Sequence, residues 1–452
     1  MPDITREYIA LRDQYIENRF RHLNPVQREA VFTTEGPLLI LAGAGSGKTT
    51  VLVNRIANII RFGAAHGSRE LTRAVTEQDL EELRTAVQTG RDLPREAAYL
   101  AVRPARPWNV LAITFTNKAA GELKERLRAM LGETVGGDVN ASTFHSACVR
   151  ILRRDAERIG FPKSFTIYDT DDQQRVLKQI YKDKMIDDKF LPVKSAVAQI
   201  SSFKDKLLSP EDVAAETPRD TKAALVAQIY SAYAVRLKQA GAMDFDDLIF
   251  HTVRLLQQDA EAREYYQNKF RYVVVDEYQD TSIAQFHLVR LLAGGTNNVC
   301  VVGDDDQSIY KFRGATIENI LNFEQVFTGA KTIRLEQNYR STSNILNAAN
   351  SVIKNNAGRK GKTLWTENGD GDKVHHYTAA NEQDEASHIA DIISENLRAG
   401  AHLRDHAVLY RMNAQSNPVE TYFARAGIPY RIVGGQRFFD RKEVKDINSY
   451  LA

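Results

Sequence analysis

The chain has 452 residues, of which 43% are hydrophobic and 26% are charged, and its formal net charge is +2. This length exceeds what one hydrophobic core supports, so we expect roughly two to four domains of ordinary globular composition. The small net charge excludes a strongly basic protein, and a nucleic-acid site would therefore have to be a local groove. No apolar run approaches the roughly 20 residues of a membrane span, and residues 1–7 show no signal-peptide pattern.

Cysteine occurs twice, at Cys148 and Cys300, each time inside an apolar segment. Two such residues predict buried thiols in a reducing compartment, and neither a disulfide framework nor a metal site. We therefore expect a cytoplasmic protein without a membrane partner.

The first helix signal stands just ahead of a glycine-rich stretch. Asn24 is suited to cap a helix and Pro25 to occupy its first position. The side-chain amide of Gln27 could donate to and accept from an adenine edge. Taken alone, Gln27 is more typical of a surface helix position, and only its context favours the binding role.

Residues 36–50 predict a phosphate-binding loop, because the apolar run Leu38–Leu41 is followed by AGAGSGKT and then by a helical pattern. Glycines let backbone N–H groups turn toward phosphates, and the helix start adds positive dipole. Lys48 can reach the β- and γ-phosphates, and the Thr49 hydroxyl can hold Mg²⁺. The residues expected to bind the nucleotide here are Ala42, Gly43, Ala44, Gly45, Ser46, Gly47, Lys48, Thr49 and Thr50.

Ala42 takes the place of the first glycine of the usual pattern, which is tolerable where φ is negative. The alternative is a glycine-rich turn that binds nothing, and the Lys-Thr pair together with the strand–helix context disfavours it.

Residues 62–108 depart from a compact nucleotide-binding layout and predict a helical insertion on the surface of the first domain. Thr76 to Asp79 resemble a capping box, and apolar residues follow at helical spacing until prolines break the pattern. Arginines lie among these prolines. A solvated decoration is the favoured interpretation, and an extra contact to duplex nucleic acid is the alternative.

Two further strand ends carry polar and aromatic residues. A buried strand from Asn109 leads to Phe115 and a polar loop, at the position where open α/β sheets bind ligands. Phe115 could meet a base, although a core phenylalanine is the common alternative. His145 lies at another strand-to-helix junction, where it could be a satisfied structural histidine, and no neighbouring His or Cys completes a metal pair.

Residues 164–241 carry mostly helical signals and few strand signals, which predicts a helical subdomain inserted into the first domain. Thr170 to Gln173 resemble a second capping box, and Ser201 to Lys206 predict some basic surface. The acids Asp244, Asp246 and Asp247 could bind a metal ion, but at a helix start they more simply cap N–H groups.

The run Tyr272 to Thr281 carries the chemistry, because three valines predict a buried strand and two acids follow at its end. Asp276 is placed to order the waters of Mg²⁺, and Glu277 can take a proton from the attacking water. An acid pair on a buried strand is costly as mere structure. Together with the phosphate-binding loop, this pair indicates hydrolysis as well as binding.

The next strand, from Asn298, leads to GDDDQSIYKFRG. Gln307 sits where a strand end could sense the γ-phosphate. Tyr310 and Phe312 alternate with Lys311 and Arg313, a composition typical of a base-stacking platform. Each stacked base contributes roughly 1–3 kcal/mol without sequence readout. Two core aromatics are the alternative, and the flanking charges weaken it.

These motifs together resemble the superfamily 1 DNA helicases of the UvrD/Rep/PcrA group. The matching stretches are LNPVQREAV, AGAGSGKT, TFTNKAA, TFHS, DFDDL, VVVDEYQDT, GDDDQSIYKFRGA and LEQNYRS. They follow the family's order over nearly the whole chain apart from residues 62–108. The resemblance implies a pair of P-loop, RecA-like parallel α/β domains that close on ATP and Mg²⁺ and translocate 3′ to 5′ on single-stranded DNA.

The resemblance also implies roles for single residues. Gln27 would contact adenine, Tyr339 would stack on it, and Arg340 would reach the γ-phosphate across the cleft. With Lys48, Asp276, Glu277 and Gln307, Arg340 would complete the catalytic set, in which Thr49 and Asp276 hold the metal. The residues expected to hold DNA are Phe115, Thr116, Asn117, His145, Tyr310, Phe312, Arg313, Arg411 and Asn413.

We expect residues 1–163 and 242–330 to form the first motor domain, residues 164–241 the inserted helical subdomain, and residues 331–452 an incomplete second motor domain. The expected partners are single-stranded DNA, junctions of single-stranded and duplex DNA, and repair or replication proteins.

Three departures from the family pattern qualify these expectations. Phe312 stands where tryptophan is common, and Thr50 stands where many members have arginine. The chain ends at Ala452, before the family's later motifs, among them a second arginine of the ATP site. We therefore expect an N-terminal fragment that binds ATP and DNA weakly and hydrolyses slowly, since a supplied arginine accelerates related reactions by roughly 10³–10⁵.

Two rival functions stay open from the sequence. One is the helicase portion of a helicase–nuclease recombination enzyme, and the other is an ATP-gated DNA-binding module without unwinding. A P-loop kinase or GTPase is disfavoured, because neither needs an aromatic and basic loop after the acid pair.

Overall fold

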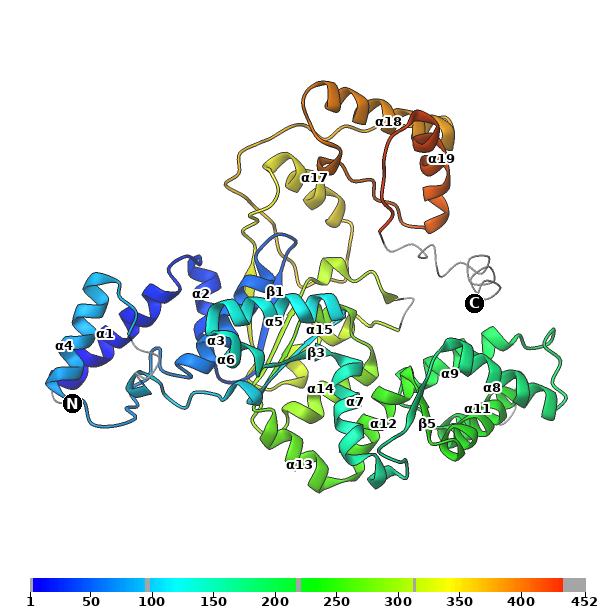
Figure 1. Cartoon of the computed structure of the whole chain (residues 1–452), viewed down its shortest axis with the longest axis horizontal. Helices are drawn as coiled ribbons and strands as arrows, with labels where there is room; N and C mark the ends of the chain where they lie inside the picture. Colours follow the sequence, from blue (N-terminus) through cyan, green and yellow to red (C-terminus); the bar gives the residue numbers. More distant parts are fainter. Residues whose placement is uncertain (1–2, 94–97, 217–220, 312–313, 434–452) are drawn as a thin grey trace, which may run out of the picture. The chain divides into compact units, whose positions relative to one another are not determined.

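The computed structural model describes residues 3–93, 98–216, 221–311 and 314–433. The chain divides into two compact units, residues 1–372 and 373–452. Figure 1 shows the elements in sequence colours. The helices of the first unit are α1 Asp3–Arg19, α2 Pro25–Phe32, α3 Lys48–Arg61, α4 Glu77–Thr89, α5 Asn117–Leu131, α6 Glu133–Gly137, α7 Phe144–Asp155, α8 Thr170–Asp183, α9 Val193–Asp205, α10 Pro210–Glu216, α11 Thr221–Gln239, α12 Phe245–Gln258, α13 Ala260–Lys269, α14 Ile283–Ala293, α15 Glu318–Leu321, α16 Phe323–Val326 and α17 Ser343–Ile353.

The first unit is organised around a six-stranded sheet with the order β3-β2-β6-β7-β1-β8, in which every pairing is parallel. The strands are β1 Leu38–Ala42, β2 Val110–Thr114, β3 Asn140–Thr143, β6 Tyr272–Val275, β7 Val299–Gly303 and β8 Lys331–Leu335. Because all six run in one direction, their carboxyl ends lie along one edge, where α/β sheets bind ligands. This confirms the predicted P-loop α/β class.

Both faces of the sheet are covered, as expected for parallel strands. Along β1, Leu38 and Ile40 belong to one hydrophobic core, and Leu39 and Leu41 belong to another. The first core includes side chains of α1 to α5, and the second includes α7 and α12 to α14. Figure 1 shows the sheet between these groups of helices. Cys148 and Cys300 are fully buried and unpaired, as the sequence predicted.

The expected start of a second motor domain at residue 331 falls at the first residue of β8. This strand pairs with β1, from Leu38↔Lys331 to Ala42↔Leu335. A domain boundary at residue 331 would therefore separate the edge strand β8 from the sheet to which it belongs. The first compact unit continues to Asp372.

The insertion at residues 62–108 packs its helix α4 against α1, and Leu80 and Leu83 enter the first core. Its capping box is as predicted, with Thr76 accepting from the Asp79 N–H and Asp79 accepting in return. The arginines of this region described with acidic partners are Arg73 with Asp79, Arg84 with Glu7 and Glu81, and Arg103 with Glu70. These pairs favour the solvated interpretation over a contact to duplex nucleic acid.

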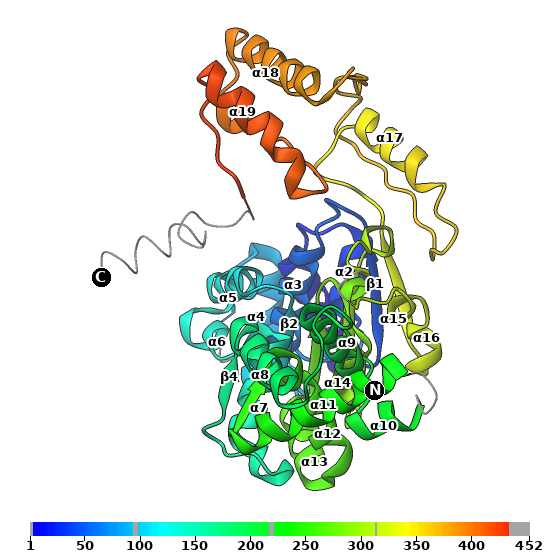
Figure 2. The same ribbon diagram turned by 90° about the vertical axis from the view of Figure 1, so that its right-hand side faces the viewer.

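Residues 177–242 build a third hydrophobic core from α8 to α11. This group is flanked by the parallel pair β4 Thr166–Tyr168 and β5 Ala242–Asp244. Figures 1 and 2 show α8, α9 and α11 together beside α12. The predicted capping box at Thr170 is wrong by one residue, because Asp169 caps α8 and pairs with Asp172.

The basic surface predicted for Ser201 to Lys206 is also wrong in part, because Lys204 is buried. Its ammonium lies 2.7 Å from carboxylate oxygens of both Asp244 and Asp247. These two acids form the capping box at the start of α12, which confirms the capping interpretation of this cluster. Lys204 therefore links α9 of the helical insertion to α12, one of the helices that cover a face of the sheet.

We predict that Lys204→Met lowers the free energy of unfolding by about 3–5 kcal/mol, because two buried carboxylates lose their cation. Urea titration followed by circular dichroism measures this loss. Lys206→Met, at an exposed position two residues along the same segment, should change stability by less than about 0.5 kcal/mol. Equal losses in both variants would contradict the assignment.

The second unit contains α18 Glu382–Arg398 and α19 Ser416–Ala426, which pack on each other around Ala390, Ile393 and Phe423. Among the described residues of both units, no helix is long and apolar enough to cross a membrane.

Candidate nucleotide and DNA site

The phosphate-binding loop connects β1 to α3 and contains two glycines in the left-handed region. Gly45 has φ +69° and Gly47, which precedes α3, has φ +83°. A side chain at Gly45 would also collide with Asn338, whose Nδ2 lies 2.7 Å from the position of a Cβ. Ala42 ends β1 without a positive φ, so the alanine is tolerated there as expected.

The carbonyl oxygens of this loop are held from outside. Asn338 Nδ2 donates to Ala44 O at 2.6 Å, Tyr339 N to Gly45 O at 2.9 Å, and Gln27 Nε2 to Ser46 O at 3.0 Å. Within the described residues, the N–H groups of Ala44, Gly45 and Gly47 have no hydrogen-bond partner. Unpaired N–H groups before a helix start are what a phosphate requires.

Gln27 is buried in the structure and is not a surface position. Its Oε1 accepts from Asn24 N at 3.1 Å, which closes the capping box of α2, and its Nε2 bonds Ser46. Asn24 and Pro25 begin this helix as predicted. One N–H and one lone pair of the Gln27 amide are left for an adenine edge, so that role stays a prediction.

The acid pair follows β6 directly. Glu277 adopts a left-handed backbone with φ +50°, and its Oε2 lies 3.2 Å from Lys48 Nζ. Burial, and then the negative charge of Glu277, raises the pKa of Asp276 to about 6. The structure thus brings the lysine of the phosphate-binding loop and the candidate base into one ion pair.

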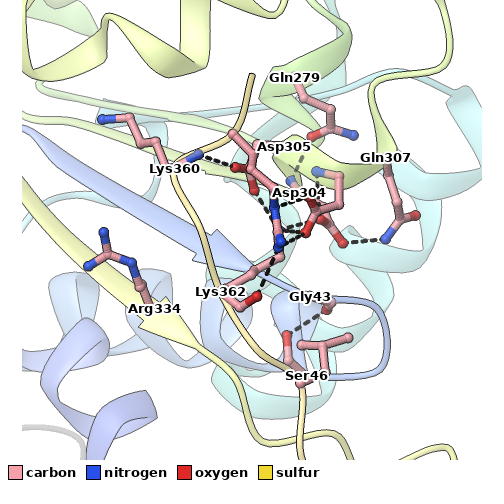
Figure 3. Close-up of polar contacts among 12 residues, drawn as sticks. Gly43, Ser46, Gln279, Asp304, Asp305, Gln307, Arg334, Lys360 and Lys362 are labelled. Carbon is pink, nitrogen blue, oxygen red and sulfur yellow. Dashed lines mark hydrogen bonds and ion pairs between the residues drawn. The ribbon is translucent and has the colours of Figure 1, made fainter. Parts of the chain in front are cut away.

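Gln279 connects this ion pair to the next strand end. Its Nε2 donates to Glu277 Oε2 at 2.9 Å, and its Oε1 accepts from Asp304 N at 2.9 Å. The side chain of Gln307 in turn donates to the Asp304 carboxylate. Figure 3 shows Gln279 and Gln307 on either side of Asp304. A polar path therefore runs from Lys48 to the predicted γ-phosphate sensor.

Tyr339 and Arg340 lie on the segment after β8, beside the phosphate-binding loop. The buried Asn338 shapes this segment, since its Oδ1 accepts from Arg340 N at 2.8 Å and from Ser341 N at 2.7 Å. Asn24 Nδ2 donates to the Tyr339 hydroxyl at 2.8 Å. The half-exposed Tyr339 ring and the exposed Arg340 are thereby anchored to the unit that carries Lys48.

We predict that Asn338→Ala lowers the free energy of unfolding by about 1–3 kcal/mol, because it leaves two N–H groups and Ala44 O without their partner. Urea titration provides the measurement. The control is Asn344→Ala, which removes one side-chain bond to the carbonyl of Gly371 at an exposed position. If the two variants lose the same stability, Asn338 has no special role in this turn.

Four of the predicted DNA-binding residues follow neighbouring strands β2 and β3. Phe115 is half-buried and packs edge-to-face on Phe144, with the two ring centroids 5.8 Å apart. Thr116 and Asn117 are exposed at the start of α5. His145 is half-buried at the start of α7, and burial lowers its pKa. Phe245 is 51% exposed, and its ring centroid lies 5.9 Å from that of His145.

Tyr310 follows β7 at the same edge of the sheet and is 39% exposed, so it is not a core aromatic. Phe312 and Arg313 lie outside the described residues. Arg411 and Asn413 are exposed in the second unit, next to the start of α19. Their DNA-binding roles stay predictions.

Two acidic arrangements bear on metal binding. Asp304, Asp305 and Asp306 are the one group of acids spaced for a metal ion in the part of the chain that the structure describes, but Lys362 Nζ lies within 2.7 Å of all three. The predicted Mg²⁺ residues are elsewhere. Thr49 is on the first turn of α3, and Asp276 is at the end of β6 beside the Lys48–Glu277 pair.

Several residues of the site were missed by sequence reasoning. Gln279 lies inside the motif VVVDEYQDT and Asn338 inside LEQNYRS, so their motifs were the available signal. Phe245 lies within DFDDL, where the three acids are the stronger sequence signal. Lys362 had no signal, because its three partners lie more than 50 residues earlier in the chain.

A parallel sheet with a glycine loop between β1 and α3, and an acid pair after β6, defines the P-loop class of protein. The family model of the UvrD/REP helicase N-terminal domain matches residues 23–97 and 93–328, and that of the UvrD-like helicase C-terminal domain matches residues 333–452. The chain therefore belongs to the UvrD/REP helicase family, which confirms the resemblance seen in its motifs.

Curated relatives agree with this assignment. The ATP-dependent DNA helicase PcrA of Staphylococcus aureus is 49% identical over 430 residues, which cover 95% of this chain and 53% of the relative. The protein of the same name from Staphylococcus epidermidis is 48% identical over 431 residues with the same coverage. The chain thus spans about half the length of these relatives.

The family models and the structure divide the chain differently. The two models meet between residues 328 and 333, close to the expected division at residue 331, whereas the first compact unit extends to Asp372. The segment from β8 to residue 372 therefore belongs to the second family model by sequence and to the first unit by packing.

Proposed function

We propose that this chain carries the ATP-driven motor of a DNA helicase that moves 3′ to 5′ on single-stranded DNA. One observation carries the proposal: the polar path from Lys48 through Glu277, Gln279 and Asp304 reaches Gln307, three residues before the exposed Tyr310. A change at the nucleotide therefore has a direct structural route to a candidate stacking residue. The PcrA relatives, named as ATP-dependent DNA helicases, support the same activity.

Nucleotide binding begins at the unpaired N–H groups of the loop, which donate hydrogen bonds to the phosphate oxygens. Lys48 then gives up its ion pair with Glu277 and binds the β- and γ-phosphates. This exchange is favourable because the electrostatic attraction of an ammonium to several phosphate charges is stronger than its attraction to one half-exposed carboxylate. Tyr339 covers the adenine, and Gln27 contacts its edge. Arg340 and Gln307 face the γ-phosphate.

Release of Lys48 leaves Glu277 free to accept a proton from the attacking water. Gln279 keeps this carboxylate oriented through its bond of 2.9 Å. Thr49 and Asp276 would hold Mg²⁺, which neutralises phosphate charge during transfer.

Hydrolysis then acts on the DNA through the loop after β7. Gln307 and Tyr310 share this short loop, so a shift of Gln307 on loss of the γ-phosphate moves the stacked base. Phe115 and His145 provide further contacts at the neighbouring strand ends. Base stacking and phosphate contacts read no sequence, so the motor would act on any strand.

We predict that Glu277→Gln preserves ATP binding and lowers turnover at least about 100-fold, the range for removal of a general base. Binding should be as tight as in the parent or tighter, because Lys48 loses its carboxylate partner. A fluorescent ATP analogue measures affinity and phosphate release measures turnover. Lys48→Ala is the contrast, with weaker binding expected. Undiminished turnover in Glu277→Gln would remove Glu277 as the base.

We predict that Tyr310→Ala weakens binding of a fluorescent oligo-dT by about tenfold, the loss for one stacked base. Fluorescence anisotropy measures this affinity. Tyr310→Phe keeps the ring and should remain within about twofold of the parent. If both variants bind like the parent, Tyr310 is not part of the stacking platform.

A further inference from the structure

The ammonium of Lys362 is enclosed by three consecutive carboxylates. Nζ lies 2.7 Å from Asp304 Oδ1, 2.5 Å from Asp305 Oδ1 and 2.7 Å from Asp306 Oδ2. A lysine has three N–H donors, so each carboxylate receives one. The side chain of Lys362 is 2% exposed, and Figure 3 shows it meeting the loop after β7.

The remaining oxygens of these carboxylates are also engaged. Asp304 Oδ2 accepts from the Gln307 side chain, Asp305 Oδ2 accepts from Lys360 N at 2.7 Å, and Arg359 pairs with Asp306 at 2.8 Å. Burial opposes the charge of Asp305, but the hydrogen bond and the charge of Lys362 outweigh burial and lower the pKa of this acid. Each of the three carboxylates therefore has a second partner besides Lys362.

The charges explain why this turn needs Lys362. Three adjacent carboxylates repel one another strongly where water is excluded, and their oxygens lie close enough to hold a metal ion. Lys362 fills that position with a covalently tethered cation. Asp304 therefore keeps one fixed orientation, with Oδ1 directed at Lys362 and Oδ2 directed at Gln307.

The segment that carries Lys362 also contacts the phosphate-binding loop. Leu364 is so close to Gly43 that a Cβ there would lie 2.1 Å from Leu364 Cδ2. Trp365 O accepts from Asn338 N at 2.7 Å, and Asn338 in turn holds Ala44 O. Residues 359–365 thus contact both loops of the nucleotide site.

We propose that Lys362 is a positioning residue for the γ-phosphate: it locks the Asp304 turn so that Gln307 is held ready for a triphosphate and not for a diphosphate. The inference rests on the proposed ATP-binding function. Lys362 itself touches no nucleotide and acts through Asp304 and Gln307.

The test compares affinities for ADP and for the slowly hydrolysed analogue ATPγS, each measured by competition with a fluorescent nucleotide. Lys362→Met should weaken ATPγS about tenfold, the loss of one charge-assisted hydrogen bond, while ADP stays within about twofold. Lys360→Met is the matched control, because its ammonium pairs with Glu324 and not with the aspartates. This control should match the parent for both nucleotides.

A general loosening of the fold would weaken both nucleotides equally, and that result would overturn the proposal. The double variant Lys362→Met with Asp305→Asn relieves part of the repulsion and should fold while keeping the selective loss of ATPγS affinity. A selective loss that disappears in the double variant also counts against Lys362.

Trp365 reports whether the segment stays in place. The chain has two tryptophans, so Trp108→Phe leaves Trp365 as the single emitter. Its emission should shift in Lys362→Met and not in Lys360→Met. If the parent binds neither nucleotide, the proposed function fails. If the parent binds both and Lys362→Met keeps the parent's preference, only the positioning role fails.

Discussion

The phosphate-binding loop depends on hydrogen bonds that reach its carbonyl oxygens from neighbouring segments. Asn338, Tyr339 and Gln27 hold the carbonyls of three successive residues, Ala44 to Ser46. The C=O and N–H of a trans peptide point in opposite directions, so the held carbonyls of Ala44 and Ser46 leave the N–H groups of Gly45 and Gly47 directed to the opposite side. The site is thereby organised before a ligand arrives, which is the condition for strong electrostatic stabilisation.

The same segments carry the residues that we propose contact the nucleotide. Residues 337–340 follow an edge strand of the sheet, and Arg340 is attached through Asn338 to the loop it serves. Arg340 lies in the same compact unit as Lys48, and its reach to the γ-phosphate stays a prediction.

Local signals were enough to predict much of the fold and site. The phosphate-binding loop, the acid pair and the caps at Asn24 and Thr76 each depend on neighbours within a few residues, and all lie where the sequence placed them. The one predicted cap that was wrong differed by a single position, at Asp169. The family could be predicted as well, because the order of the motifs extends over nearly the whole chain.

Long-range partners could not be predicted in this way. Lys362 reaches an aspartate 57 residues away and Asn338 a carbonyl 294 residues away, distances at which sequence carries no spacing signal. Lys204 looked like surface charge because nothing nearby revealed its acids, 40 residues later. Such buried polar residues are conspicuous only once tertiary packing has brought their partners together.

The burial of both cysteines has a practical consequence for labelling. Burial raises the pKa of the Cys148 thiol to about 12 and also raises that of Cys300, so neither forms the reactive thiolate at neutral pH. A cysteine introduced at the surface would then be the sole thiol that a maleimide dye modifies quickly. Pairs of dyes placed in the two units could report their separation while the native cysteines remain in place.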